Sequence, residues 1–359
     1  MDLPHSRLLN QRLAGTPSPQ PVQTVAWLGA VQAQDYRAAL WTVGARTQAA
    51  TEETIEQALA TGKIVRTWLL RGTLHFVAAA DVHWLRGLLA PRLLARSTRR
   101  FQQLDLDESV VARALALLVE ALRGGQHLTR AALYQVLEQA HISTAHQRGY
   151  HLLWRAAQEG LLCLGPRSDK QETFTLLDEW VPPTRILIRD EALAELAARY
   201  FTSHGPATLA DFVWWSGLAT AEARAGLEMV QPQLVRELVQ GRDYWLPACG
   251  PDQDGASSSA YLLPAFDEYL VGYKERHAVL APSLAKQINP GGGLLAPTIV
   301  VDGQVVGVWK RTLKRKAPLV RATLFTRLTP AAAQAVETAA ARYGQFVGLP
   351  VELSCTQEL

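Results

Sequence analysis

Two glutamines one residue apart, Gln32 and Gln34, lie beside the carboxylate of Asp35 in the alanine-rich stretch AVQAQDYRAAL. A glutamine amide is neutral and too weakly basic to take a proton at neutral pH. Its carbonyl oxygen can still accept a hydrogen bond from an attacking water, and its NH₂ group can donate to a phosphate, sugar or base. The pair can therefore hold a water molecule in place. Asp35 can stabilise a nearby cation, or it can pair with Arg37 or Arg46.

The local backbone decides which of these groups act together. In a helix, Gln32 and Asp35 share a face, whereas Gln32 and Gln34 diverge by about 200°. In an extended segment, or at a helix end, the two glutamines lie on the same side. The sequence leaves both geometries open. We take Gln32 and Gln34 as the catalytic candidates and Asp35 as the alternative.

Positive charge is concentrated in two segments of a chain whose net charge is only +3. Residues 86–100 carry five arginines and residues 309–321 carry six basic side chains, with no acid in either segment. Such islands are typical of a surface that binds a polyanion, although solvated helix faces give the same pattern. The candidate contacts from the two islands are Arg96, Arg99, Trp309, Lys310 and Arg311. For Trp309, stacking on a base competes with a place in the core.

Two further stretches carry candidate binding residues. In LLRGTLHFV, the sequence predicts a strand on which Arg71, Thr73 and His75 share a face that lines either a polar channel or a solvent edge. In AFDEYLVGYKER, Lys274 and Arg276 are candidate phosphate contacts. The acids that precede them, at positions 267 and 268, are expected to be structural partners.

One order of elements recurs along the chain. Residues 126–180 predict a helix that Thr129 caps, a short break, a second helix and then two short strands, which is the order of a winged helix. Residues 205–247 repeat this order with Thr208 as the cap, and residues 21–78 give a more divergent third copy. Repetition of one unit is stronger evidence than any single occurrence.

The sequence pattern changes from mainly helical to strand-like after the Gly/Ser/Asp-rich stretch 249–261. An Asp302–Gly303 turn between β-branched segments predicts a hairpin, and a further strand and a clear helix follow. These elements predict a small β-barrel or sheet closed by a helix. The predicted domains are a first winged-helix unit with a helical extension at 1–120, a second unit at 121–190, a third at 191–250 and the barrel at 251–359.

Composition bounds the class of protein. Of the 359 residues, 48% are hydrophobic and 19% are charged, which is globular composition. No apolar run is long enough for a membrane span and the N-terminus lacks a secretory signal, so we expect a cytoplasmic protein. The three cysteines lie far apart without a CxxC pair, which disfavours a zinc site or a disulfide framework. We expect no metal or other cofactor.

Five stretches resemble the winged-helix DNA glycosylases of the AlkZ-like type: LGAVQAQDYRAALWTVGAR, RTWLLRGTLHFV, DFVWWSGL, LLPAFDEYLVGYKER and VDGQVVGVWKR. They follow family order from residue 28 to 311. The resemblance implies an α+β, mainly helical fold of three winged-helix units in a C shape, with a C-terminal β-barrel and a channel for duplex DNA. It places the family's Gln–apolar–Gln motif on Gln32–Ala33–Gln34. A sister branch has an acid in place of the second glutamine, which this chain lacks.

The resemblance also implies an activity, because members of the double-glutamine branch excise N-alkylated purines, and some protect antibiotic producers from alkylating or crosslinking products. Base excision is glycoside hydrolysis through an oxocarbenium-like transition state. A purine alkylated at N7 or N3 is cationic and leaves as a neutral base without protonation, so amides suit such substrates. We expect a monomeric, monofunctional glycosylase acting on duplex DNA that carries alkylated purines, bulky adducts or interstrand crosslinks.

Two other functions fit parts of the pattern. A non-catalytic winged-helix DNA binder, such as a transcription regulator, would use the same helical units. Regulators are usually short and dimeric, however, with one winged helix per subunit. A protein–protein scaffold of tandem winged helices would need neither the glutamine pair nor the basic islands. No lysine lies beside the glutamine motif to form a Schiff base, so lyase activity is not expected.

Overall fold

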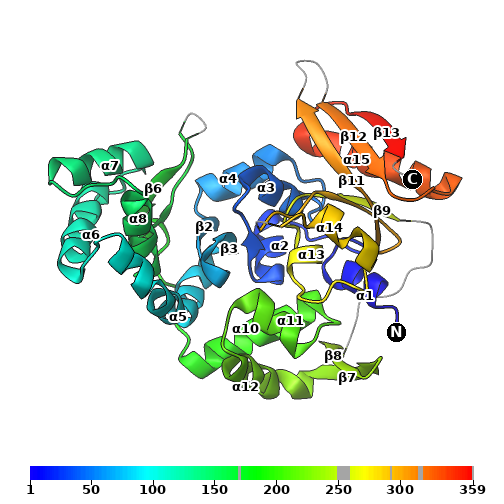
Figure 1. The fold of residues 1–359 in the computed structure, drawn as a ribbon, viewed down its shortest axis with the longest axis horizontal. Coiled ribbons are helices and arrows are strands. Elements are labelled where there is room, and N and C mark those ends of the chain that lie inside the picture. Colours follow the sequence, from blue (N-terminus) through cyan, green and yellow to red (C-terminus); the bar gives the residue numbers. More distant parts are fainter. Residues whose placement is uncertain (169–170, 249–258, 292, 314–317, 358–359) are drawn as a thin grey trace. The chain divides into compact units, whose positions relative to one another are not determined.

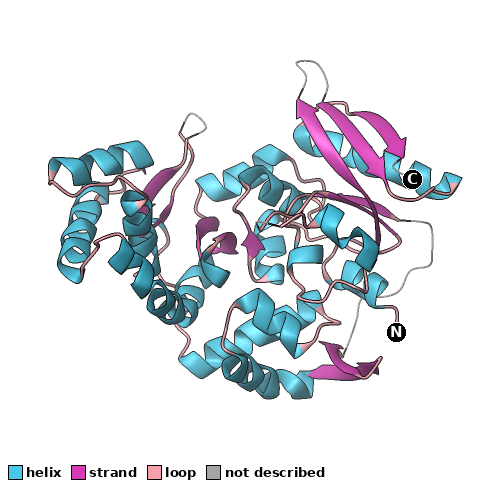
Figure 2. Cartoon of the chain, in the orientation of Figure 1, coloured by secondary structure: helices cyan, strands magenta, loops and turns pink. Residues whose placement is uncertain are grey.

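The computed structural model describes residues 1–168, 171–248, 259–291, 293–313 and 318–357. Contacts divide the chain into two compact units, one of Met1–Glu56 with Ala194–Leu359 and the other of Gln57–Leu193. Helices dominate and the strands form small sheets, which confirms the predicted α+β, mainly helical class (Figure 2). The division into four domains stays a prediction. Residue 249, a predicted free cysteine, and residues 314–317 of the second basic island lie outside the described residues.

The unit Gln57–Leu193 contains four long helices and a small antiparallel sheet (Figure 1). Its helices are α5 (Val82–Gln103), α6 (Glu108–Leu122), α7 (Arg130–Gln139), α8 (Arg148–Gln158) and the short α9 (Leu177–Trp180). Its strands are β2 (Ile64–Trp68), β3 (Leu74–Ala78), β4 (Leu128–Thr129), β5 (Leu162–Leu164) and β6 (Thr173–Leu176). They follow the order β3-β2-β5-β6-β4. Apolar side chains at helical spacing on α6, such as Val111, Leu115 and Leu118, are buried in its core with Trp68 and Phe174.

Two of the predicted repeats show the expected order of elements. In the first, the order along the chain is β4, α7, α8 and the β5–β6 hairpin, and β4 pairs with β6. Thr129 caps α7 by accepting from the backbone N of Ala132 at 3.3 Å, as predicted. In the second, a bridge between Ala207 and Trp245 takes the place of β4. Thr208 caps the following helix within a capping box.

The elements of the second repeat follow one another without long connections. They are α10 (Arg189–His204), α11 (Leu209–Ser216), α12 (Thr220–Val230), β7 (Leu234–Val239) and β8 (Arg242–Pro247). Gly217 ends α11 in the left-handed region, at φ 72°, where a side chain would be strained. The N-terminal elements come in a similar order. They are α1 (Leu3–Asn10), α2 (Pro21–Leu28), β1 (Val31–Gln32), α3 (Tyr36–Gly44) and α4 (Glu52–Ala60).

The C-terminal part is an open sheet rather than a barrel. Its strands, in spatial order, are β13 (Glu352–Gln357), β12 (Pro318–Leu324), β11 (Gln304–Leu313), β10 (Thr298–Val301) and β9 (Ala260–Leu263). The predicted hairpin is confirmed, since Asp302 and Gly303 both have positive φ and join β10 to β11. Across the described ranges β9 and β13 are edge strands, so the predicted closed barrel is not confirmed.

A helix covers the apolar side of this sheet, which explains how the sheet is stable without closure. The helix α15 (Pro330–Val347) contacts β9 and β10. Its Tyr343 lies edge-on to Trp309 of β11 with ring centroids 5.1 Å apart. Two short helices, α13 (Glu268–Val271) and α14 (Ala285–Ile288), precede the hairpin. Among the described residues, no helix combines the length and the hydropathy that a membrane crossing requires.

Candidate active site

The glutamine segment is extended, and the next helix begins only after it. Gln32 is the second residue of β1, and α3 starts at Tyr36. Val31 and Ala33 are fully buried, whereas Gln32 is 9% exposed and Gln34 is exposed. Gln32 ends β1 and Gln34 lies in the bend between β1 and α3, so the two glutamines are not part of one helix. Of the two geometries that the sequence left open, the structure excludes the helical one.

Asp35 has a structural task of its own. It is the N-cap of α3, and its Oδ1 accepts from the backbone N of Ala38 at 3.1 Å. Its alternative partner from the sequence, Arg46, instead forms a buried ion pair with Asp267. The capping bond gives a structural reason for an acid after the glutamines, and a catalytic role of Asp35 stays a prediction.

Replacing Asp35 by alanine is expected to lower the free energy of unfolding by about 1 kcal/mol, because the first turn of α3 loses its capping acceptor. Asp35→Asn keeps a capping oxygen and should unfold close to wild type in urea. A loss in Asp35→Asn as large as that in Asp35→Ala would show that the negative charge, not the cap, is what stabilises this position.

A buried carboxylate holds the backbone of the glutamine segment. Glu268 Oε1 accepts from the backbone N of Gln32 at 3.0 Å. Glu268 Oε2 accepts from Trp215 Nε1 at 3.0 Å and lies 3.4 Å from His204 Nε2. Burial lowers the pKa of His204, although Glu268 opposes this effect. Sequence reasoning missed this contact, since Glu268 lies 236 residues from Gln32 and no local pattern joins them.

Arg71 and His75 do not share a strand face. The strand predicted from Arg71 begins only at Leu74, because Arg71 lies in a short 3₁₀ turn with φ 58° and ψ 7°. That left-handed conformation interrupts the alternation on which the prediction relied. His75 is on β3, is 1% exposed, and its Nδ1 lies 2.8 Å from the carbonyl oxygen of Thr73. Both residues belong to the unit Gln57–Leu193.

The other candidates of that unit are exposed on a long helix. Arg96 and Arg99 lie on the C-terminal half of α5, where their side chains face solvent. They are therefore accessible to a polyanion.

Lys274 and Arg276 line one cavity of about 290 Å³, together with His277 and Lys286. Lys274 is exposed, and its backbone N donates to Asp211 Oδ1 at 3.0 Å. Arg276 Nε donates to the carbonyl oxygen of Leu270 at 2.8 Å, and burial lowers the pKa of its guanidinium. The pocket gathers basic groups from two segments, which suits a phosphate.

Of the two places that the sequence left open for Trp309, a stacking residue on the surface or a place in the core, the structure has the core. Its indole is 5% exposed, and Nε1 donates to the carbonyl oxygen of Leu263 at 2.8 Å. Arg311 donates to the hydroxyl of Tyr343 at 2.6 Å, and Lys310 is exposed. Since β11 alternates, the tryptophan points under the sheet and Lys310 points away from it. Only Lys310 is fully available to a partner.

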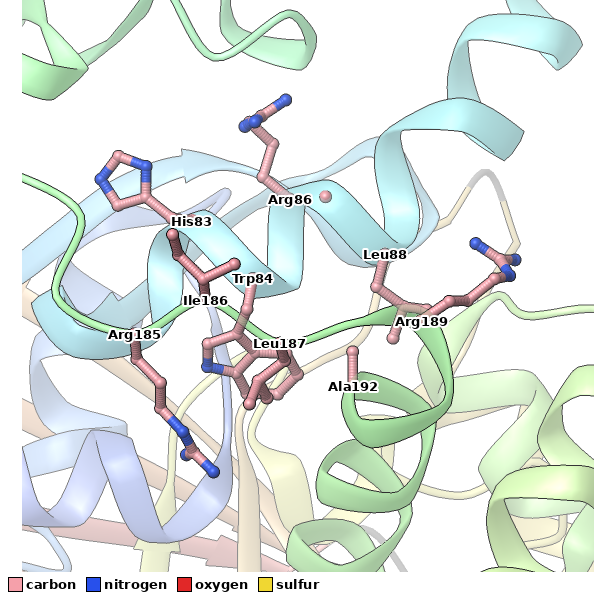
Figure 3. Close-up of a pocket in the computed structure, with 10 residues that line it drawn as sticks. His83, Trp84, Arg86, Leu88, Arg185, Ile186, Leu187, Arg189 and Ala192 are labelled. Carbon is pink, nitrogen blue, oxygen red and sulfur yellow. The ribbon is translucent and has the colours of Figure 1, made fainter.

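Two further cavities contain arginines that the sequence did not single out. A cavity of about 590 Å³ is lined by Trp27 and Arg199, and by Arg12, whose guanidinium lies 3.9 Å above the Trp27 ring. Another, of about 310 Å³, lies between α5 and the segment before α10. Figure 3 shows that the guanidinium groups of Arg86 and Arg185 at this second cavity point in different directions. They do not converge on one anion.

No group of three or more metal-ligating side chains is found within the described ranges. The candidate site is therefore built from amides, backbone groups and one buried carboxylate. Such groups can orient water and a leaving group, and their effect on a reaction is positional and electrostatic.

Comparison with known proteins identifies the family. The chain is 28% identical over 327 residues to an interstrand DNA cross-link repair glycosylase of Streptomyces sahachiroi, covering 85% of each protein. Its structure superposes on that of Streptomyces sahachiroi DNA glycosylase AlkZ with a TM-score of 0.81 and 25% identity, covering 98% of both chains. The sequence profile of the family described as DNA glycosylase AlkZ-like matches residues 25–346. The chain therefore belongs to the AlkZ-like DNA glycosylase family.

Proposed function

We propose that this protein is a monofunctional glycosylase that hydrolyses the N-glycosidic bond of N7- or N3-alkylated purines in duplex DNA. The observation that carries the proposal is the pair Gln32 and Gln34 on an extended segment, with the neighbouring Asp35 engaged in a helix cap. Both amides can accept from a water and donate to a phosphate, sugar or base.

In the proposed reaction, the bond between C1′ and the purine nitrogen breaks and its electron pair moves onto the alkylated base. The base was cationic and leaves neutral, so no general acid is needed. A water molecule donates a hydrogen bond to a glutamine carbonyl oxygen, which orients it. This water attacks C1′ and loses a proton to solvent. Positioning of this kind contributes several kcal/mol when the geometry is fixed. The products are a free base and an apurinic site in an intact strand.

The same argument explains why unmodified bases would be spared. A neutral purine needs protonation before it can leave, and an amide cannot supply a proton at neutral pH. The site therefore selects for purines that are already cationic and leave without protonation. The name of the Streptomyces sahachiroi relative as a cross-link repair glycosylase supports extending the proposal to bulky adducts and interstrand crosslinks attached at purine N7.

Duplex DNA is the proposed partner, bound by a monomer. The repeated order of helix, short strand or bridge, helix, helix and hairpin supports three winged-helix units, which commonly bind DNA. The exposed cations support contacts to phosphate, which provide most of the sequence-independent affinity. The proposed contacts are the exposed Arg96, Arg99, Lys274 and Lys310, the half-buried Arg276, Arg311 and Arg71, and the buried His75.

The test is base release from a duplex carrying a single N7-methylguanine, with the unmodified duplex as the matched control. We expect the free methylated base to appear, the unmodified duplex to be untouched, and the product strand to break only after alkali. Strand breakage without alkali would contradict a monofunctional enzyme. Retained duplex binding without base release, from this or a bulkier N7 adduct, would favour a non-catalytic DNA-binding protein.

A further inference from the structure

The side chain of Glu268 is buried, so its carboxylate cannot contact a substrate. The side chain is 1% exposed and belongs to α13, four residues that begin directly after the N-cap Asp267. Its two oxygens accept from Gln32 N and Trp215 Nε1, each at 3.0 Å. Glu268 therefore joins the glutamine segment to α11 of the second repeat, within one compact unit.

The adjacent acid, Asp267, is paired with a buried arginine. Arg46 directs both ends of its guanidinium to Asp267, with contacts of 2.7 and 2.9 Å. His204 lies 3.4 Å from Glu268 Oε2, but burial lowers its pKa, which favours the neutral ring at neutral pH. A buried carboxylate is costly unless hydrogen bonds compensate it. The N–H groups of Gln32 and Trp215 supply that compensation, and bonds to an ionised acceptor are about twice as strong as neutral ones.

The glutamine segment is a short connection between two helices. β1 contains two residues, and the segment lies between the C-cap of α2 at Gly29, with φ 79°, and the N-cap of α3 at Asp35. A short connection of this kind gains its position from contacts with residues distant in the sequence. The bond from Gln32 N to Glu268 is such a contact, and it acts on the very residue that carries the first amide.

We infer that Glu268 is a positioning residue for base excision, which sets the place of the Gln32 amide by holding the Gln32 backbone N–H. The inference rests on the proposed function of the glutamine pair. It adds a residue that never touches DNA. A displacement of about 1 Å at a catalytic group can lower a rate by about 10²-fold, so a change at Glu268 alters the reaction step rather than duplex affinity.

The decisive variant is Glu268→Asp, whose carboxylate is one methylene shorter and cannot reach both donors. Tyr269→Phe is the matched control, because it removes a buried hydrogen bond from the same short helix, that of Tyr269 Oη to the carbonyl oxygen of Gly303, without touching Gln32. We expect Glu268→Asp to lower the single-turnover rate of base release by about 10-fold or more at unchanged duplex Kd. Tyr269→Phe should retain the wild-type rate.

A double-mutant comparison separates positioning from a general structural effect. Gln32→Ala removes the amide that Glu268 is proposed to position. In that background Glu268→Asp should therefore lower the rate of base release little further. Losses that multiply in the double variant would overturn the inference, as would a folded Glu268→Asp variant with the wild-type rate.

A readout independent of activity tests the contact itself. Hydrogen exchange at the Gln32 amide should accelerate about 10-fold or more in Glu268→Asp and stay unchanged in Tyr269→Phe. Unchanged exchange in Glu268→Asp would overturn the inference even if wild type releases no base, a result that would count against the proposed function alone. If Glu268→Asp is too unstable, Glu268→Gln is measured instead. Its neutral oxygen binds the N–H more weakly, so exchange should again rise, by a smaller factor.

Discussion

Gln32→Ala should lower the rate of release of N7-methylguanine by at least ~10-fold, and Gln34→Ala should do the same. A 10-fold loss corresponds to about 1.4 kcal/mol of transition-state stabilisation, a modest share of what a positioned water provides. Neither side chain fills the core, because Gln34 is exposed and Gln32 lies at the boundary of the buried region. Duplex affinity and the unfolding transition should therefore stay close to wild type. Single-turnover kinetics and a binding titration measure the two effects separately.

The matched control for these variants is Gln48→Ala, which removes an exposed glutamine elsewhere in the same compact unit. Its rate should equal that of wild type. If base release survives both substitutions in the motif, the amides do not position the water, and Asp35 becomes the residue to test. In that case Asp35→Asn, which keeps the helix cap, separates charge from structure. A loss of duplex binding in Gln32→Ala or Gln34→Ala would instead assign the amides to DNA contact.

The spacing of Gln32, Gln34 and Asp35 could be read from the sequence, but their geometry could not. Both a helix and an extended segment satisfy the local pattern, and propensity does not decide between them for a short stretch. Contacts distant in the sequence decide between them, and one of these, from Gln32 N to Glu268, spans 236 residues. A long-range hydrogen bond to a backbone N–H leaves no periodic signal in the chain. The acids of the AFDEYLVGYKER stretch were expected to be structural, and the structure shows which partners they have.

Helix caps and turns were predicted more successfully than the architecture of the C-terminal sheet. The caps Thr129 and Thr208 and the turn at Asp302–Gly303 depend on residues only a few positions apart, and all three are present. The C-terminal sheet depends instead on the parallel pairing of β12 with β13 and on cover by α15. Alternation shows that a strand has a buried face, but it does not show whether a helix or further strands cover it. The buried indole of Trp309 follows from the same helix cover.

Arg46→Met should lower the free energy of unfolding by about 3–5 kcal/mol, because it breaks a buried ion pair. Arg46 and Asp267 are both fully buried, and their pair is bidentate. The remaining N–H groups of Arg46 donate to the carbonyl oxygens of Gln11 and Thr42 and to Gln11 Oε1, at 2.8–3.0 Å. Methionine fills much of the volume but leaves Asp267 as a buried carboxylate without its cation. Urea unfolding, followed by circular dichroism, measures the change.

The double variant Arg46→Met with Asp267→Leu shows whether the loss of stability in Arg46→Met arises from the unpaired carboxylate of Asp267. Removing both charges leaves no unpaired carboxylate, and replacement of a buried ion pair by apolar residues is often neutral or stabilising. We therefore expect the double variant to be more stable than Arg46→Met alone, although Asp267 also caps α13 through the backbone N of Tyr269. A double variant less stable than Arg46→Met would show that the cap and the hydrogen bonds of Arg46 to Gln11 and Thr42, rather than the ion pair, hold these segments together. That result would also predict slower base release, because α13 carries Glu268 and through it fixes the position of Gln32.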